Sequence, residues 1–362
     1  MPSVTRFCLL VLGVFPAALV GCNNAPTESL ASTQPVSTTS PVESESEAFP
    51  VAFLEGVPLP SPSSLVLLSG DILIDVDAGS ERRVDGLPVG EDLVLWNVAA
   101  GGGAVVMVDC HVECGGPEVF AVDVESGAAR SIAFGFPTPA PDGVWVKRYV
   151  SEAACTLSKV GLDGATLAAE RAFDCDLAVG EETSLGLVVS LAQDGSEGAI
   201  LDPETLDTVI ETGNVLAVIE DQLLSWEGGS FTVRDHATGA ERELASPTDV
   251  GTPSNAGTSP DGRVIAVTFQ HPAWPGPRQR LDVWMLEVAT WEWSRLPSMP
   301  VAAALKATDE AWAPDGRFVI FGSFDQAGHA VATWRPGDRD LAVRQIDADP
   351  SGSLVVWTNS TP

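Results

Sequence analysis

The sequence predicts an all-β domain, and three observations support that prediction. Apolar residues nowhere recur at helical spacing with caps, so no amphipathic helix is indicated. Gly and Pro make up 61 of 362 residues, above the usual share of about one in eight. Together with Asp and Asn they divide the chain into short β-branched and aromatic runs. These runs recur at a nearly constant spacing, which favours a repeated all-β architecture.

The first recurring unit is a tight turn followed by an apolar strand. Its clearest copies span residues 259–269 and 313–323, where Ser or Ala precedes Pro-Asp-Gly-Arg. A third copy begins at residue 140 and a weaker one at residue 349. In such a turn Pro presets φ, Asp caps the turn and Gly takes the left-handed position. The predicted repeat-turn residues are Pro141, Asp142, Gly143, Pro260, Asp261, Gly262, Pro314, Asp315 and Gly316.

The second unit is a strand, a polar turn and another strand. It occurs at residues 72–84, 119–134, 156–173, 199–212, 231–245, 281–296 and 331–346. The turn centres run from Gly79 to Gly337 with a mean spacing of 43 residues. A period of this length with several short strands is typical of a β-propeller. The seven copies predict about seven blades, with six or eight as alternatives.

The two ends of the domain predict how the ring closes. The chain finishes with an isolated strand at residues 354–357, and the domain begins with the apolar run 65–68. Pairing these strands in one blade would close the ring and remove its open edges. We therefore expect residues 51–362 to form a single propeller, present as a monomer.

The Ser/Ala-Pro-Asp-Gly-Arg turns, each followed by a hydrophobic strand, resemble the TolB-type β-propeller repeat family. The resemblance is specific in residues 259–323 and rests on the period alone elsewhere. It implies a periplasmic location and partner binding rather than catalysis. Unlike that family, the chain shows no separate N-terminal α/β domain.

The N-terminus predicts export. Arg6 precedes the apolar run 7–20, which at fourteen residues is shorter than the roughly 20 needed to span a bilayer. The run ends in Leu-Val-Gly-Cys22, which resembles the bacterial lipobox. The resemblance implies a signal peptide at 1–21 and a lipid on Cys22, anchoring the protein to the cell membrane or outer membrane. The alternative is an ordinary secretory signal that happens to contain a cysteine.

Residues 22–50 are expected to be the lipidated cysteine and a disordered tether. Positions 23–50 hold ten Ser or Thr, four Pro, and no Lys or Arg. Such a segment buries too little apolar surface to offset its ordering entropy. It would hold the extracytoplasmic domain away from the membrane.

Four cysteines remain in the domain: Cys110, Cys114, Cys155 and Cys175. An even number in an exported domain predicts two disulfides. We expect the pairs 110–114 and 155–175, because each pair would face across a hairpin. The alternative for Cys110-His-Val-Glu-Cys114 is a zinc or copper site, since two thiolates and an imidazole lie within five residues.

Other candidate sites have a simpler structural alternative. Each Pro-Asp-Gly turn offers one carboxylate, whereas Ca²⁺ prefers six to eight oxygens, so we expect turn capping and no metal. Trp291 and Trp293 alternate onto one face of a strand. They predict either a stacking platform for a sugar or peptide, or packing between blades. The four His are scattered, and no nucleophile-elbow, zincin, phosphate-loop or dinucleotide motif occurs, so no catalytic residue or cofactor is predicted.

The formal net charge of −31 limits the choice of partner. A field of this sign repels nucleic acid and anionic lipid head groups and favours basic partners or divalent cations; adaptation to habitat is the alternative explanation. We predict a non-catalytic scaffold of the cell envelope that binds a protein or a small ligand. The alternative is a propeller-type hydrolase or dehydrogenase, such as a lactonase, glycosidase or quinoprotein, with acidic residues at the channel mouth.

Overall fold

The computed structural model describes residues 54–90, 93–110, 116–151, 153–191, 197–270, 278–324, 328–350 and 353–358. Within these ranges the regular elements are 29 β-strands, and no helix is long and apolar enough to cross a membrane. The all-β prediction is confirmed. The predicted signal peptide, Cys22 and the tether lie outside the described residues.

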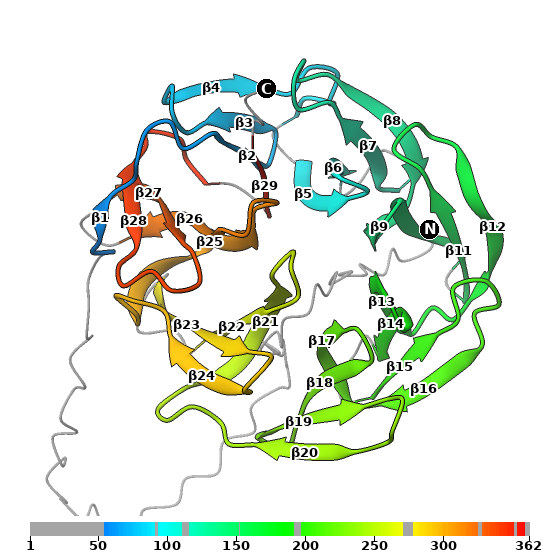
Figure 1. The fold of residues 1–362 in the computed structure, drawn as a ribbon. Helices are drawn as coiled ribbons and strands as arrows, with labels where there is room; N and C mark the ends of the chain where they lie inside the picture. The colour runs from blue at the N-terminus through cyan, green and yellow to red at the C-terminus, as the bar shows by residue number, and fades with distance from the viewer. Residues whose placement is uncertain are drawn as a thin grey trace, which may run out of the picture.

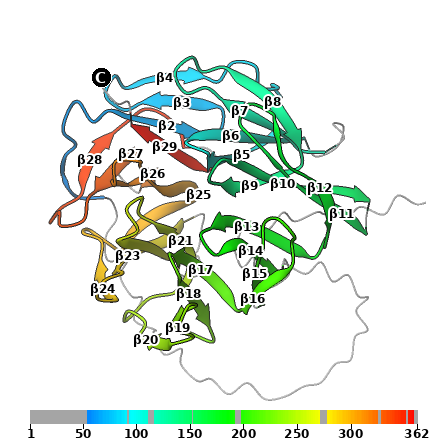
Figure 2. The same ribbon diagram turned by 45° about the vertical axis from the view of Figure 1, so that its right-hand side comes forward.

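The strands form seven antiparallel four-stranded units, which we call blades 1 to 7. Five are separate sheets, and two belong to one nine-stranded sheet that also contains β1. The blades are arranged in a ring around a common centre (Figure 1), and their outermost strands lie on the periphery (Figure 2). Seven is the predicted number of blades.

Each blade runs from an innermost strand near the centre of the ring to an outermost strand at its rim. In that order, blade 1 consists of β29 (Leu354–Thr358), β2 (Leu65–Ser69), β3 (Ile72–Asp75) and β4 (Ser80–Arg83). Blade 2 consists of β5 (Leu93–Ala100), β6 (Gly103–Cys110), β7 (Glu118–Val122) and β8 (Ala129–Phe134). Blade 3 consists of β9 (Phe136–Ala140), β10 (Gly143–Ser151), β11 (Ala154–Val160) and β12 (Thr166–Phe173). Blade 4 consists of β13 (Leu177–Thr183), β14 (Gly186–Leu191), β15 (Gly198–Leu201) and β16 (Thr208–Thr212).

The remaining three blades follow the same order. Blade 5 consists of β17 (Asn214–Ile219), β18 (Gln222–Glu227), β19 (Ser230–Asp235) and β20 (Glu241–Leu244). Blade 6 consists of β21 (Thr252–Thr258), β22 (Val264–Gln270), β23 (Arg278–Glu287) and β24 (Glu292–Arg295). Blade 7 consists of β25 (Val301–Trp312), β26 (Phe318–Phe324), β27 (Gly328–Trp334) and β28 (Ala342–Gln345), with β1 (Val57–Pro58) added parallel to the outer edge of β28.

The hydrophobic core is divided among the blade interfaces. Each of seven apolar clusters is built from two neighbouring blades, including one between blades 7 and 1. Because successive side chains of a strand point to opposite faces, a middle strand supplies both of its interfaces. On β22, Val264 and Ala266 face blade 7, while Ile265 and Val267 face blade 5. The continuous apolar runs seen in the sequence follow from this burial on both faces.

Blades 6 and 7 are joined more closely than the others. The first four residues of β23 pair with the first four of β25, from Arg278 opposite Ala304 to Leu281 opposite Val301. This pairing makes the two blades one nine-stranded sheet. The sequence pattern did not predict it, because most of the paired residues lie outside both repeat units.

The apolar run 65–68 and the last strand pair as predicted. β2 and β29 are antiparallel, from Leu65 opposite Thr358 to Ser69 opposite Leu354. Blade 1 is therefore assembled from both ends of the described chain. That this pairing holds the ring closed remains a prediction.

The Pro-Asp-Gly turns join the first and second strands of blades 3, 6 and 7. Gly262 and Gly316 are left-handed, with φ of 68° and 81°, as expected. Gly143 is not; it begins β10, where a Cβ would lie 2.2 Å from the carbonyl oxygen of Val160. In that copy the glycine is required by close backbone approach, not by turn conformation. The weaker copy at residue 349 precedes β29, the first strand of its blade, and so occupies a different position from the other three.

Candidate functional site

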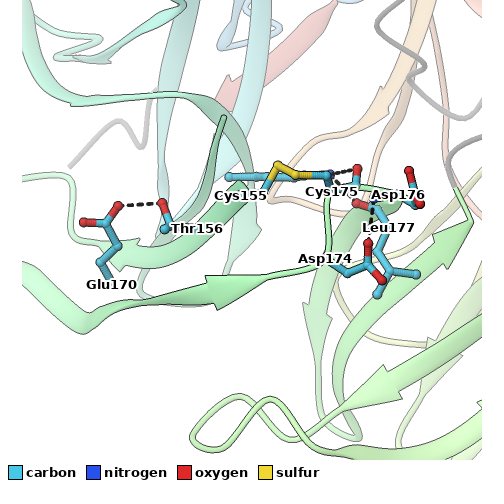
Figure 3. Close-up of a disulfide and its surroundings, with 8 residues drawn as sticks. Cys155, Thr156, Glu170, Asp174, Cys175, Asp176 and Leu177 are labelled. Atoms are coloured by element: carbon cyan, nitrogen blue, oxygen red, sulfur yellow. Dashed lines mark hydrogen bonds between the residues drawn. A yellow bond between two sulfur atoms is a disulfide. The ribbon is translucent and has the colours of Figure 1, made fainter. Parts of the chain in front are cut away.

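The structure contains one of the two predicted disulfides. Cys155 and Cys175 are bonded, with Cα atoms 5.2 Å apart (Figure 3). They join the start of β11 to the link between β12 and β13. Cys110 ends β6, but its side chain and Cys114 lie outside the described residues, so the 110–114 disulfide and its metal-site alternative remain predictions.

Trp291 and Trp293 pack toward the neighbouring blade. The ring of Trp293 lies 5.1 Å from Phe231 and 6.2 Å from Phe269, between centroids. Its Nε1 donates a hydrogen bond to the carbonyl of Ala245 at 3.0 Å. Trp291 is half-buried in the cluster between blades 5 and 6. These contacts favour inter-blade packing, one of the two interpretations of this pair, over a stacking platform.

The aspartates of the Pro-Asp-Gly turns are engaged within the protein. Asp261 accepts hydrogen bonds from the Ser259 hydroxyl and the Arg263 backbone. Asp315 forms ion pairs with Arg317 and Arg335, at 2.8 and 2.9 Å. Asp142 instead forms an ion pair with Lys159 of β11. Among the described residues, no group of three or more His, Cys, Asp or Glu could hold a metal ion.

The structure also shows an exposed aromatic pocket between blades 2 and 3. Its volume is about 360 Å³. The apolar side chains Phe134, Tyr149 and Val150 are 55%, 47% and 58% exposed. Phe136 meets Tyr149 edge to face, with centroids 5.7 Å apart. The lining residues are Gly116, Pro117, Phe134, Gly135, Phe136, Arg148, Tyr149 and Val150. We call this set the aromatic pocket.

A glycine places the two phenylalanines of the pocket. Gly135 links β8 to β9 with φ of 134°, and a Cβ there would lie 2.5 Å from the carbonyl oxygen of Lys147. Any larger residue would push this link away from β10. The sequence Phe134-Gly-Phe136 therefore places one phenylalanine at the end of β8 and the other at the start of β9, on either side of the tight link between blades 2 and 3.

A buried lysine contacts the Tyr149 side of the aromatic pocket. Lys147 Nζ donates to the carbonyls of Cys175 and Leu177, at 2.8 and 2.5 Å. It also lies over the rings of Tyr149 and Phe173, 5.1 and 5.7 Å from their centroids. The Cys155–Cys175 disulfide holds the residue whose carbonyl accepts the first of these hydrogen bonds. The Tyr149 side of the pocket is thus cross-linked to the link between β12 and β13 by covalent, hydrogen-bond and cation–π interactions.

The electrostatics around Tyr149 are set by burial and by nearby acids. Desolvation lowers the pKa of Lys147, opposed by Asp174 and Asp176. Desolvation raises the pKa of Tyr149, and the charge of Asp176 raises it further. Both aspartates are exposed and flank Cys175 in the chain (Figure 3). The Tyr149 edge of the pocket therefore faces negative charge.

A second candidate site lies on the innermost strand of blade 7. Asp309 accepts hydrogen bonds from the backbone N–H groups of Leu354 and Glu310, at 2.8 and 2.9 Å. Glu310 accepts from the Thr268 hydroxyl at 2.6 Å and from the Asn255 amide at 3.2 Å. These adjacent acids thus link blade 7 to blade 1 on one side and to blade 6 on the other.

Burial perturbs both acids of this pair. Desolvation and then the neighbouring Glu310 charge raise the pKa of Asp309 to about 7. Desolvation also raises the pKa of Glu310. A carboxyl group that titrates near neutral pH, as Asp309 does, is a candidate acid–base group.

Neither site was predicted from the sequence, although each has a signal there. The signal for the aromatic pocket is Phe-Gly-Phe at 134–136, and for the acids it is Asp309-Glu310 inside a long strand. Both signals depend on side chains from other blades. The pocket needs Tyr149 of β10, and the acids need Leu354 of β29.

No protein-family model matches the chain. A segment of 69 residues, 19% of the chain, is 32% identical to the Tol-Pal system protein TolB of Nitratidesulfovibrio vulgaris, and the match spans 14% of that protein. The crystal structure of TolB from Acinetobacter baumannii is similar with a TM-score of 0.43 at 12% identity, over 81% of this chain and 65% of that one.

Two further solved structures resemble the fold more closely. A putative 6-phosphogluconolactonase from Bacteroides fragilis has a TM-score of 0.51 at 14% identity, over 82% of this chain and 99% of that one. A prolyl endopeptidase has a TM-score of 0.55 at 12% identity, over 84% of this chain and 53% of that one. At these identities the similarity shows the fold alone: this chain is an all-β propeller with weak sequence similarity to TolB.

Proposed function

We propose that this protein is a lipid-anchored, extracytoplasmic β-propeller that binds a protein partner of the cell envelope without catalysing a reaction. The observation that carries the proposal is the aromatic pocket, where three exposed apolar side chains line one cavity. Exposed aromatic residues in a pocket are typical of binding sites, because their burial supplies much of the affinity. The weak similarity to TolB supports the same class of function.

The Cys155–Cys175 disulfide supports the proposed location, since disulfides form and persist mainly outside the cytoplasm. The anchor itself is proposed from the lipobox at Cys22. In a Cys22→Ala variant the protein should leave the membrane fraction, and labelled fatty acid should attach to the wild type only. Two acyl chains or more give stable anchoring, so the expected change is nearly complete. Membrane association that persists without label would contradict the anchor.

The binding function is tested in cells with a photo-crosslinking residue. We would place p-benzoylphenylalanine at position 134 in the pocket, or at Val209 as the matched control. Val209 is 50% exposed on β16, outside the pocket. The expected result is a discrete adduct at position 134 and none at position 209. Equal crosslinking at both positions, or none at position 134, would contradict a binding role for this pocket.

The second candidate function is a propeller-type hydrolase. The observation that favours it is Asp309, whose pKa of about 7, raised by burial and by the adjacent Glu310, would allow proton transfer at neutral pH. The fold similarity to a putative 6-phosphogluconolactonase is compatible with a lactone substrate. The dehydrogenase alternative rests on sequence reasoning alone.

The hydrolase candidate is tested with the purified domain on gluconolactone and 6-phosphogluconolactone. If the scaffold proposal holds, the domain should not hydrolyse either lactone faster than buffer does. Turnover that falls at least about 100-fold in Asp309→Asn or Glu310→Gln would favour the enzyme, because a general acid or base contributes about this much. Circular dichroism of each variant would show that the fold is retained.

A further inference from the structure

The aromatic pocket differs from the other exposed apolar positions of the described chain because its residues are clustered. Phe134, Tyr149 and Val150 line one cavity, whereas Val57, Val89, Leu167 and Val209 do not line it. Single exposed apolar residues are ordinary on protein surfaces, but a group within a pocket marks an interaction site. A volume of about 360 Å³ lies at the small end of ligand pockets. It suits one large side chain of a partner.

The charge around the aromatic pocket is negative. Arg148 lines the pocket, but its guanidinium forms an ion pair with Glu170 at 2.5 Å, and that carboxylate also accepts from the Thr156 hydroxyl. The positive charge of Arg148 is thereby neutralised by Glu170. Among the residues that the structure describes, further charged side chains near this site are Lys147 over the Tyr149 ring, Asp174 and Asp176 near Lys147, and Glu118 opposite Phe134.

Three of these acids are available to form ion pairs with cations of a binding partner. Glu118, Asp174 and Asp176 form no ion pair with any Arg or Lys of the described chain within 4.0 Å. Asp174 and Asp176 act on Lys147 at longer range only. Complementary charge at the rim of an interface steers association and selects partners.

We propose that the aromatic pocket binds an extended, positively charged peptide segment of a protein partner, through one aromatic side chain seated in the pocket and Lys or Arg residues on either side. The inference rests on the proposed binding function and adds the chemistry of the partner. The aromatic side chain packs against Phe134, Phe136 and Val150. The flanking cations pair with Asp176 and Asp174 at one edge and with Glu118 at the other.

A single residue reports on this pocket. Tyr149 is the one tyrosine in the sequence. Incorporation of 3-fluorotyrosine therefore gives one ¹⁹F resonance, located at the pocket. The probes are three synthetic peptides: Lys-Lys-Gly-Phe-Gly-Lys-Lys, the same peptide with Glu for every Lys, and the same peptide with Ala for Phe. Chitohexaose is included as a glycan probe.

The proposal expects a saturable ¹⁹F shift with the basic phenylalanine peptide and at least about tenfold weaker binding of the other two peptides. A short peptide with one anchor should bind with a Kd of about 1 mM, so titration runs to about 5 mM. Phe134→Ser should abolish the shift, whereas Val209→Ser, an exposed apolar position outside the pocket, should leave it unchanged. Asp174→Asn combined with Asp176→Asn should weaken binding three- to tenfold and reduce its dependence on salt.

Three results would overturn the proposal. They are equal or tighter binding of the acidic peptide, a shift with chitohexaose alone, and no shift with any peptide at the highest concentration. The peptide assay and the crosslinking assay test different claims, so either can fail without the other. An adduct at position 134 without basic-peptide binding would retain the scaffold and reject this partner chemistry. Peptide binding without an adduct in cells would retain the chemistry of the pocket and reject the proposed function.

Discussion

Asp309 shows how the tertiary structure changes the chemistry of a single residue. Its pKa is raised to about 7, first by desolvation and then by the adjacent Glu310. The folded protein therefore binds a proton at Asp309 more tightly than the unfolded chain does. This contribution to stability is fully present below the unfolded pKa of about 4 and is lost as pH rises through about 7.

We expect Asp309→Asn to stabilise the protein at pH 8. The amide oxygen still accepts the Leu354 N–H, but no charge is desolvated. One pKa unit corresponds to about 1.4 kcal/mol, and the side chain is partly exposed, so the expected gain is about 1–2 kcal/mol, shrinking toward pH 4. Urea unfolding between pH 4 and 8 measures it. Asp340→Asn, at an exposed loop position, is the control. A gain that is the same at every pH would show that Asp309 ionisation is not its cause.

At the scale of the element, the Cys155–Cys175 disulfide stabilises blade 3 and the pocket beside it. The bond closes a loop with a sequence separation of 20 residues. Replacing both cysteines by Ala should cost about 2–3 kcal/mol of unfolding free energy, the modest value expected for a short loop. Denaturant unfolding under non-reducing conditions checks this value.

The same double variant should alter the pocket. Cys175 holds one of the carbonyls that bind Lys147, which lies over Tyr149. Once Cys175 is released, Tyr149 should become better hydrated, so its raised pKa should fall toward the ordinary value near 10. Absorbance titration at alkaline pH follows this lone tyrosine. An unchanged titration midpoint would show that the disulfide does not support the pocket.

β29 is the element on which we expect the ring to depend. It supplies the innermost strand of blade 1, and its buried residues Leu354, Val355 and Val356 contact the cores toward blades 7 and 2. Deleting residues 353–362 would expose the edge of β2 and both of these interfaces. We expect a loss of several kcal/mol together with aggregation. Deleting only residues 359–362 is the control. A melting temperature equal to that of the wild type would show that the β2–β29 pairing does not hold the ring closed.

At the scale of the whole molecule, the net charge of −31 predicts how the protein meets its partner. If the partner is basic, association is steered by a field that salt screens. Raising the ionic strength from about 10 mM to 150 mM shortens the screening length from about 30 Å to 8 Å. The association rate of the crosslinked partner should fall markedly, whereas dissociation should change less, because it depends on the buried aromatic anchor. Association that is insensitive to salt would remove charge as the explanation.

Much of this architecture is predictable because it is local and repeated. Short β-branched and aromatic runs, Pro-Asp-Gly turns between them, and a spacing of 43 residues between units predict an all-β propeller of about seven blades. They do so because each blade must bury both faces against its neighbours. The symmetry of residues 155 and 175 about a hairpin likewise predicts their disulfide. Such features follow from the order of residues along the chain.

Other features depend on which strands meet in space. The sequence predicts that Trp291 and Trp293 share one face of a strand, but Trp291 lies in the turn before β24, with a left-handed φ of 58°. Only the position of Phe231 and Phe269 in the packed blades places Trp293 in a core. Gly143 resembles a turn glycine, but the nearby Val160 carbonyl is what excludes a side chain there. The sequence by itself determined the repeat, and it predicted about seven blades and one disulfide that the structure contains. The tertiary structure alone decided the aromatic pocket and the raised pKa of Asp309, because both arise where side chains distant in sequence exclude water together.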